Sequence, residues 1–274
     1  MSDLVEPQGP GARAGAPAGT NATEELAGHG HFTTHFDEPS LDFDGPVSLI
    51  DDGVLDELAM IAARYPQPRS ALLPMLHLVQ SVEGRVTPAG IEACAAILGL
   101  STADVSGVAT FYTMYKRRPV GKYHVGVCTT ALCAIMGGDE VYARLQDHLG
   151  VGNDETTDDG QVTLEHLECN AACDYAPVMM VNWEFFDNTT PERAVEVVDA
   201  LRADVGVQAT RGARVVSSKE TERVLAGFPD GRADEGPTSG EASRLGLQIA
   251  RERGWHAPAA PPPEQHNDEP TENA

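Results

Sequence analysis

The chain has 274 residues, of which 42 are acidic and 19 are basic, so its formal net charge is −23. This acidity argues against a nucleic-acid-binding protein, which needs basic faces to displace counterions from phosphates, and against binding to anionic membrane surfaces. No stretch approaches the roughly 20 apolar residues of a membrane-spanning helix, and residues 1–30 lack the apolar block of a signal peptide. We therefore expect a protein of the cytoplasmic side, either free or held peripherally at a membrane as part of a larger complex.

Charge, proline and glycine divide the chain into four parts. Residues 1–50 hold eight acids, Arg13 as their one base, and many Pro and Gly residues, so we expect a disordered acidic arm. Residues 51–115 have helical periodicity, and residues 116–210 mix strands with helices. Residues 211–274 end in a proline-rich, polar stretch, which predicts an extended tail.

The first folded part is expected to be a small helical bundle. A helix should begin near Asp52 and stop before Pro66, and a second should span about Ser70 to Val82 with Pro74 in its first turn. Thr87-Pro88 is a cap followed by proline, which begins a third helix. A fourth, short helix should begin at the capping box formed by Ser101 and Asp104.

For the second folded part, residues 116–210, the sequence pattern predicts a small thioredoxin-like sandwich of strands and helices. Together with the helical bundle this makes the fold class α+β. Strands are expected over residues 123–127 and 162–167, with a hairpin turning at residues 182–184. Helices should cover residues 138–149, ended by Gly150, and a last helix should begin at Thr190-Pro191. The order strand, helix, strand, hairpin, helix is typical of this layout.

Four of the five cysteines form two pairs, Cys128-x4-Cys133 and Cys169-x3-Cys173. Each pair follows a predicted strand, where loops can turn thiolates toward one point. Soft thiolate ligands suit an iron–sulfur cluster or zinc. The wide first gap matches plant-type [2Fe–2S] ferredoxins, whereas zinc sites more often have a two-residue gap. Structural disulfides are a further alternative that a cytosolic compartment disfavours.

Other candidate ligands have ordinary structural interpretations. Cys94 lies on the inward face of the third predicted helix, so we expect a packed apolar thiol. His124 and His166 lie on strands near the cysteine pairs, but four cysteines already complete a ligand set. Neither pair has the Cys-x-x-Cys spacing of a thioredoxin redox site.

Three blocks carry a family resemblance: Gly107 to Tyr115 (GVATFYTMY), Pro119 to Thr130 (PVGKYHVGVCTT) and Glu168 to Asn182 (ECNAACDYAPVMMVN). In this order they strongly resemble the 24-kilodalton [2Fe–2S] subunits of respiratory complex I, the E subunits of bacterial NADH-quinone oxidoreductases. The resemblance covers about residues 50–205. One departure is Ala171, which stands where the family usually has Gly and which disfavours a positive φ.

The resemblance implies a helical domain, a thioredoxin-like domain and one [2Fe–2S] cluster, held by Cys128, Cys133, Cys169 and Cys173. It also implies a partner subunit that binds FMN and NADH, beside other subunits of the peripheral arm.

The chain itself has no nucleotide-binding glycine loop in a strand–helix context and no base–nucleophile set. A cluster carries single electrons, whereas hydride leaves NADH as a pair that a flavin must split. We therefore expect a one-electron partner of a flavoprotein, with a low-potential cluster. Two alternatives are a diaphorase subunit of an NAD-linked hydrogenase or formate dehydrogenase, and a zinc-stapled scaffold.

Two further segments carry expectations. The basic run Lys116-Arg117-Arg118 is either a solvated turn between domains or a docking patch for a partner. The tail over residues 211–274 should be disordered in the free subunit and should anchor on neighbouring subunits through scattered apolar residues such as Phe228 and Trp255.

Overall fold

The structure is a computed structural model, and it describes residues 48–258. The expected acidic arm therefore lies outside the described residues, apart from residues 48–50. The proline-rich end of the chain beyond residue 258 lies outside them as well.

The first part of the described chain is helical, as expected. Thr87 accepts a hydrogen bond from the Gly90 amide at the start of one helix, and Ser101 and Asp104 form a reciprocal capping box at the start of the next. Pro74 lies in the first turn of its helix, where its missing N–H leaves no bond unmade. The elements are α1 (Asp52–Ala62), a 3-10 turn η1 (Pro68–Ala71), α2 (Leu72–Glu83), α3 (Pro88–Leu98) and α4 (Thr102–Phe111).

A five-stranded sheet with the order β2-β3-β1-β4-β5 follows. The central strand β1 runs parallel to β3 and antiparallel to β4, and Cys128 lies opposite Leu167. The predicted hairpin is confirmed: Asn182 and Trp183 both have positive φ, as its tight turn requires. The strands are β1 (Tyr123–Cys128), β2 (Glu155–Thr156), β3 (Val162–Leu167), β4 (Met179–Val181) and β5 (Glu184–Phe186).

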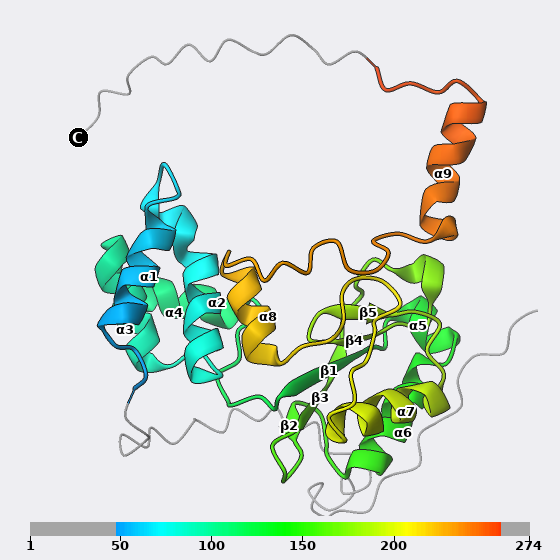
Figure 1. Cartoon of the computed structure of the whole chain (residues 1–274), viewed down its shortest axis with the longest axis horizontal. Coiled ribbons are helices and arrows are strands. Elements are labelled where there is room, and N and C mark those ends of the chain that lie inside the picture. The colour runs from blue at the N-terminus through cyan, green and yellow to red at the C-terminus, as the bar shows by residue number, and fades with distance from the viewer. Residues whose placement is uncertain (1–47, 259–274) are drawn as a thin grey trace, which may run out of the picture. The chain divides into compact units, whose positions relative to one another are not determined.

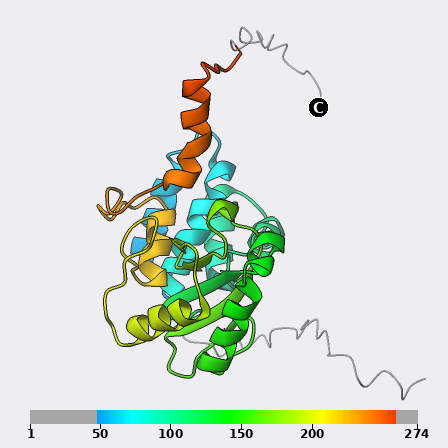
Figure 2. The same ribbon diagram turned by 90° about the vertical axis from the view of Figure 1, so that its right-hand side faces the viewer.

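Two helices cover one face of this sheet. They are α6 (Gly138–Leu149) and α7 (Pro191–Arg202), which lie side by side in both views (Figures 1 and 2). Between them and the sheet lies a core that includes Val125, Leu145, Leu164 and Val198, all fully buried. A short helix, α5 (Ala131–Ile135), follows β1 directly. This is the thioredoxin-like, α+β arrangement that the sequence predicts.

The expectation of an extended tail from residue 211 is wrong for the described residues. Val215 is buried in the core of the sheet, and α8 (Ser218–Leu225) packs against α2 (Figure 1). Ala226 is buried in the core of the helical part, with Phe228 packed against it. A further helix, α9 (Glu241–Glu252), follows. The segment therefore completes both hydrophobic cores instead of leaving them.

Polar contacts hold α8 in place. His77 Nδ1 on α2 lies 2.5 Å from Glu222 Oε2 on α8, and both side chains are buried. Arg223 forms a bidentate pair with Glu57 on α1. Ser218 donates to the Gly121 carbonyl just before β1, at 3.0 Å. These contacts connect α8 to the helical part and to the sheet.

The basic run before β1 does not act as a unit. Lys116 is buried, and its Nζ lies 2.7 Å from Glu165 Oε2 and 3.4 Å from Asp154 Oδ1. Both interpretations of the run are therefore wrong for Lys116, which is neither solvated nor available to a partner protein. A buried cation needs partners of opposite charge, and Glu165 and Asp154 supply them. Arg117 and Arg118 are exposed.

Among residues 48–258 no single helix has the length and apolar composition needed to cross a membrane; α3 and α4 meet that test only as a pair bent by 119°.

Candidate metal centre

The parallel pairing of β1 and β3 brings the four paired cysteines to one edge of the sheet. Cys128 ends β1, and Cys133 lies in α5 directly after it. Cys169 follows the end of β3 by two residues, and Cys173 begins the 3-10 turn η2 (Cys173–Tyr175). We call residues 128–133 the first cysteine loop and residues 169–175 the second. Because parallel neighbours end at the same edge, the two loops face one another.

The thiols lie in two pairs that differ in exposure. Cys169 Sγ and Cys173 Sγ are 3.5 Å apart, close to the ~3.8 Å expected for two sulfurs on one tetrahedral metal with bonds of about 2.3 Å. In the other pair, Cys128 and Cys133 belong to one buried apolar cluster. Cys128 and Cys133 are buried, whereas Cys169 and Cys173 are exposed. One half of the site is therefore enclosed by protein and the other half faces outward.

The thiols of Cys133 and Cys173 favour their protonated form. Burial is the main cause that raises the pKa of Cys133 to about 11, and the neighbouring Cys128 adds to it. The pKa of Cys173 is raised chiefly by its hydrogen bond with Cys169, with a further contribution from Cys128. These mutual effects join the two pairs into one electrostatic site. Four thiolates gathered here therefore need the positive charge of bound metal.

Backbone geometry shapes both loops. Ala171 has φ +54°, in the left-handed region that favours glycine, so the sequence-based concern about this residue is confirmed. A Cβ on Gly138, the first residue of α6, would lie 2.5 Å from the Cys128 carbonyl oxygen and 2.8 Å from that of Cys133. Glycine is therefore required where α6 meets the first loop, and alanine costs strain in the second.

Each cysteine loop contains one buried polar atom, on a residue between its two cysteines in the sequence, that has no partner among the described residues. They are the hydroxyl oxygen of Thr130 and the amide nitrogen of Asn170. A buried donor without an acceptor is costly, so in a native fold a bound group or an ordered water satisfies it. Sulfur atoms of an iron–sulfur cluster accept such hydrogen bonds. Both atoms therefore fit a cluster between the loops.

A single metal ion fits less well. Within residues 48–258, no group of three or more His, Cys, Asp or Glu side chains is arranged to hold one ion. A cluster of two irons spreads four thiolates over two metals, so each iron needs only one close pair. The arrangement in two pairs therefore favours a [2Fe–2S] cluster over zinc.

The other candidate ligands, Cys94, His124 and His166, have structural surroundings that do not involve the cysteine site. Cys94 is fully buried in the core of the helical part, and burial raises its pKa to about 12. His124 is buried with its Nε2 2.8 Å from Glu165 Oε2. His166 is exposed, and its ring packs against Tyr142 on α6.

Sequence reasoning missed the residues that hold the second loop from outside. Arg211 forms a bidentate ion pair with Asp187, at 2.7 and 2.8 Å, and its guanidinium lies 5.0 Å from the ring centre of Tyr175. At the start of α9, Ser243 Oγ donates to Asp174 Oδ2 at 2.6 Å. No local pattern reveals these contacts, because the residues that they join are far apart in the sequence.

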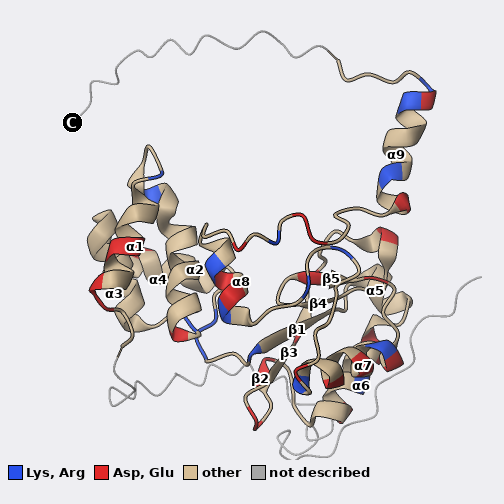
Figure 3. Ribbon diagram, viewed as in Figure 1, with Lys and Arg blue, Asp and Glu red and all other residues tan. Residues whose placement is uncertain are grey.

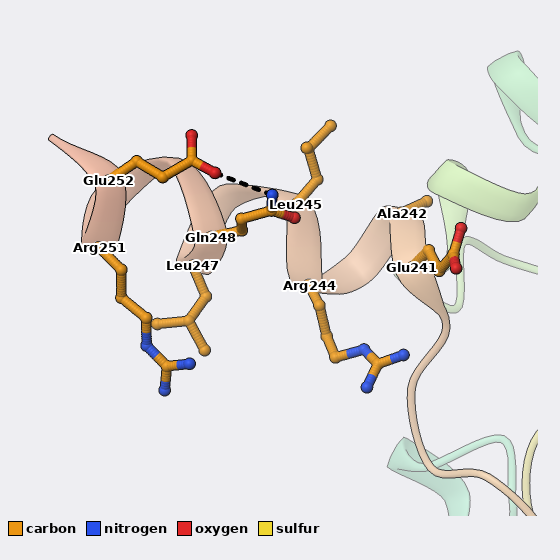
Figure 4. A pocket seen from close by; sticks show the side chains of 8 residues that line it. All are labelled: Glu241, Ala242, Arg244, Leu245, Leu247, Gln248, Arg251 and Glu252. Atoms are coloured by element: carbon orange, nitrogen blue, oxygen red, sulfur yellow. Dashed lines mark hydrogen bonds between the residues drawn. The ribbon is translucent and has the colours of Figure 1, made fainter.

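Beyond this first turn, α9 has no described element packed along it. A hollow on its surface is lined by eight side chains that all belong to α9, including exposed Leu245 and Leu247 (Figure 4). One hydrogen bond joins two of them, from Gln248 to Glu252, at 2.9 Å. The hollow is therefore a helix surface and forms no part of the cysteine site.

Comparison with known proteins agrees with this geometry. Residues 58–202 match the family model of thioredoxin-like [2Fe–2S] ferredoxins. The chain is 61% identical over 202 residues to the E subunit of the NADH-quinone oxidoreductase of Mycobacterium tuberculosis, a match that covers 73% of this chain and 80% of that protein. The second E subunit of the Rhizobium meliloti enzyme is 35% identical, with 63% of this chain and 97% of that protein covered. Subunit 2 of the Thermus thermophilus enzyme is 38% identical, with 56% and 86% covered. The chain therefore belongs to the thioredoxin-like [2Fe–2S] ferredoxin family, among the E subunits of NADH-quinone oxidoreductases.

Proposed function

We propose that this chain is the electron-transfer subunit of an NADH-quinone oxidoreductase and that Cys128, Cys133, Cys169 and Cys173 hold its [2Fe–2S] cluster. The observation that carries the proposal is the meeting of two cysteine pairs at the ends of adjacent parallel strands. The unpartnered donors of both loops support it. When bound, the cluster supplies reversible one-electron transfer.

The protein's own residues give this group an asymmetric environment. The enclosed pair lies among Ala172, Ala176 and Val178, which exclude water from that side. The exposed pair leaves the other side open to another redox group. The chain thus holds and shields a cluster on one side and leaves it accessible on the other, which fits a subunit that exchanges single electrons with a flavoprotein.

We further propose that a subunit binding FMN and NADH docks over α5 and the exposed pair. α5 carries no charged residue (Figure 3), and Leu132, Ile135 and the adjoining Met136 have exposed fractions of 45%, 82% and 56%. Apolar side chains of this exposure, next to a ligand loop, are typical of a surface that a protein partner covers. The complex would lie peripherally on the cytoplasmic side of the membrane, with no role for nucleic acid.

Single Cys→Ala replacements test the cluster ligands in the purified subunit. We expect each of the four to lose most of the visible absorption and bound iron, because three thiolates leave one iron short of a ligand. Cys94→Ala is the matched control and should change neither. Equal loss of the cluster in the control, or full retention in two of the four variants, would contradict the assignment.

The docking surface is tested with Ile135→Glu, measured as affinity for the flavin-binding subunit. We expect weaker binding with an unchanged visible spectrum, because the charge would be buried in the interface. Met60→Glu on α1, at a residue 45% exposed, is the control. Equal affinities of the two variants would place the interface elsewhere.

A further inference from the structure

Thr130 and Asn170 belong to the first and the second cysteine loop, respectively. Each lies between the two cysteines of its pair, and each buries one polar atom that has no partner among residues 48–258. The third buried side-chain atom that lacks a hydrogen bond, His124 Nε2, has the Glu165 carboxylate 2.8 Å away. Within residues 48–258, the two buried side-chain atoms that have neither a hydrogen bond nor a charged partner therefore both belong to the cysteine loops.

Thr130 also departs from the usual behaviour of its position. It is the N-cap residue of α5, where a threonine side chain normally accepts a hydrogen bond from an amide of the first turn. Here its hydroxyl makes no capping bond, although the capping side chains of α3, α4 and α7 all do. The hydroxyl is thus left free to donate elsewhere.

We propose that the Thr130 hydroxyl and the Asn170 amide donate hydrogen bonds to sulfur atoms of the cluster and thereby raise its reduction potential. Both groups can donate, and both belong to the loops that supply the ligands. Reduction adds one negative charge to the cluster, so a donor aimed at its sulfurs stabilises the reduced form more than the oxidised form. The two residues therefore act on the reduction potential of the cluster through hydrogen bonds and are not iron ligands.

This inference rests on the proposed cluster, but it makes a separate claim. Failure of the ligand assignment would show as loss of iron and colour in the control Cys94→Ala or its retention in the ligand variants. Failure of the donor assignment would leave the cluster in place and its potential unmoved. The two results are measured independently.

The test is a potentiometric titration of the purified full-length subunit, followed by the electron paramagnetic resonance signal of the reduced cluster. Thr130→Val and Asn170→Leu should each shift the midpoint potential to more negative values, and the double variant should shift it further. Thr130→Ser keeps the hydroxyl and should retain the original potential. Thr129→Val is the matched control, since the Thr129 hydroxyl is not among the buried unpartnered atoms.

A second readout follows the donated protons directly. Pulsed electron paramagnetic resonance in deuterated buffer should show an exchangeable deuteron coupled to the reduced cluster, and Thr130→Val should remove one such coupling. If Thr130→Val fails to hold a cluster, Thr130→Ser decides the question, because a shifted potential in that variant overturns the proposal. Potentials of Thr130→Val and Asn170→Leu equal to those of Thr129→Val would also overturn it, and would indicate that ordered water satisfies both atoms.

Discussion

The buried pair between His77 and Glu222 offers a quantitative test of how the C-terminal segment is attached. The two side chains come from α2 and α8, 145 positions apart, and lie 2.5 Å from one another. Glu222→Leu leaves a ring nitrogen of His77 buried without its partner. Such an orphaned group costs about 1–3 kcal/mol, and hydrogen bonds to a carboxylate lie at the upper end of that range. We therefore expect Glu222→Leu to lower the free energy of unfolding by about 3 kcal/mol.

The assay is urea unfolding followed by far-ultraviolet circular dichroism. With a slope of about 2 kcal/mol per molar urea, a loss of about 3 kcal/mol moves the midpoint down by about 1.5 M. His77→Leu alone should cost a similar amount, because it strands the carboxylate of Glu222.

The double variant, His77→Leu with Glu222→Leu, shows whether the two side chains stabilise the fold through their mutual hydrogen bond or each through its own packing. Replacing both partners by leucine removes both unsatisfied groups, so most of the lost stability should return. If the double variant loses as much as the two single variants together, the residues do not act as a pair and the reasoning fails.

Three further predictions concern the cysteine loops. Ala171→Gly should slow the release of iron to a chelator, because relief of the positive φ at this residue stabilises the loop by about 1–2 kcal/mol. Gly138→Ala should have the opposite effect and deplete the cluster in the purified protein, because its methyl group would displace the first loop; unchanged iron content would contradict this. Arg211→Ala should accelerate loss of the cluster, since it removes the contact with the second loop, whereas Arg202→Ala, which breaks an exposed ion pair with Asp159, should leave the rate unchanged.

Local signals in the sequence predicted most of the elements correctly. Thr87-Pro88 and Thr190-Pro191 begin helices where expected, because capping and proline placement depend on the nearest few residues. The approach of the two cysteine pairs also followed from local reasoning, since each pair comes after a recognisable strand. Strand β2 was missed because its two residues carry no periodicity.

The C-terminal segment could not be predicted in this way. Ser217 and Glu220 form a capping box at the start of α8, but eight residues are too few for a clear helical period amid so many Gly, Pro and charged neighbours. Its stability comes from α2, through contacts distant in sequence. The burial of Lys116 depends likewise on Glu165, 49 positions away. Tertiary packing determines whether such segments are folded or buried, and the composition of the segment alone led to the wrong prediction.

The unequal anchoring of the two cysteine loops has a consequence for local unfolding. The end of β1 is hydrogen-bonded on both sides: the Cys128 amide donates to the Val178 carbonyl at 3.0 Å, and the Thr129 amide donates to that of Leu167 at 3.3 Å. The second loop lies after the end of β3, with both of its thiols exposed. Amide hydrogens at Cys128 and Thr129 should therefore exchange with solvent only on global opening, whereas those of the second loop should exchange through small fluctuations. Reagents that dismantle the cluster would accordingly enter from the side of Cys169 and Cys173 while the sheet stays folded, and the subunit could be reloaded with iron without refolding.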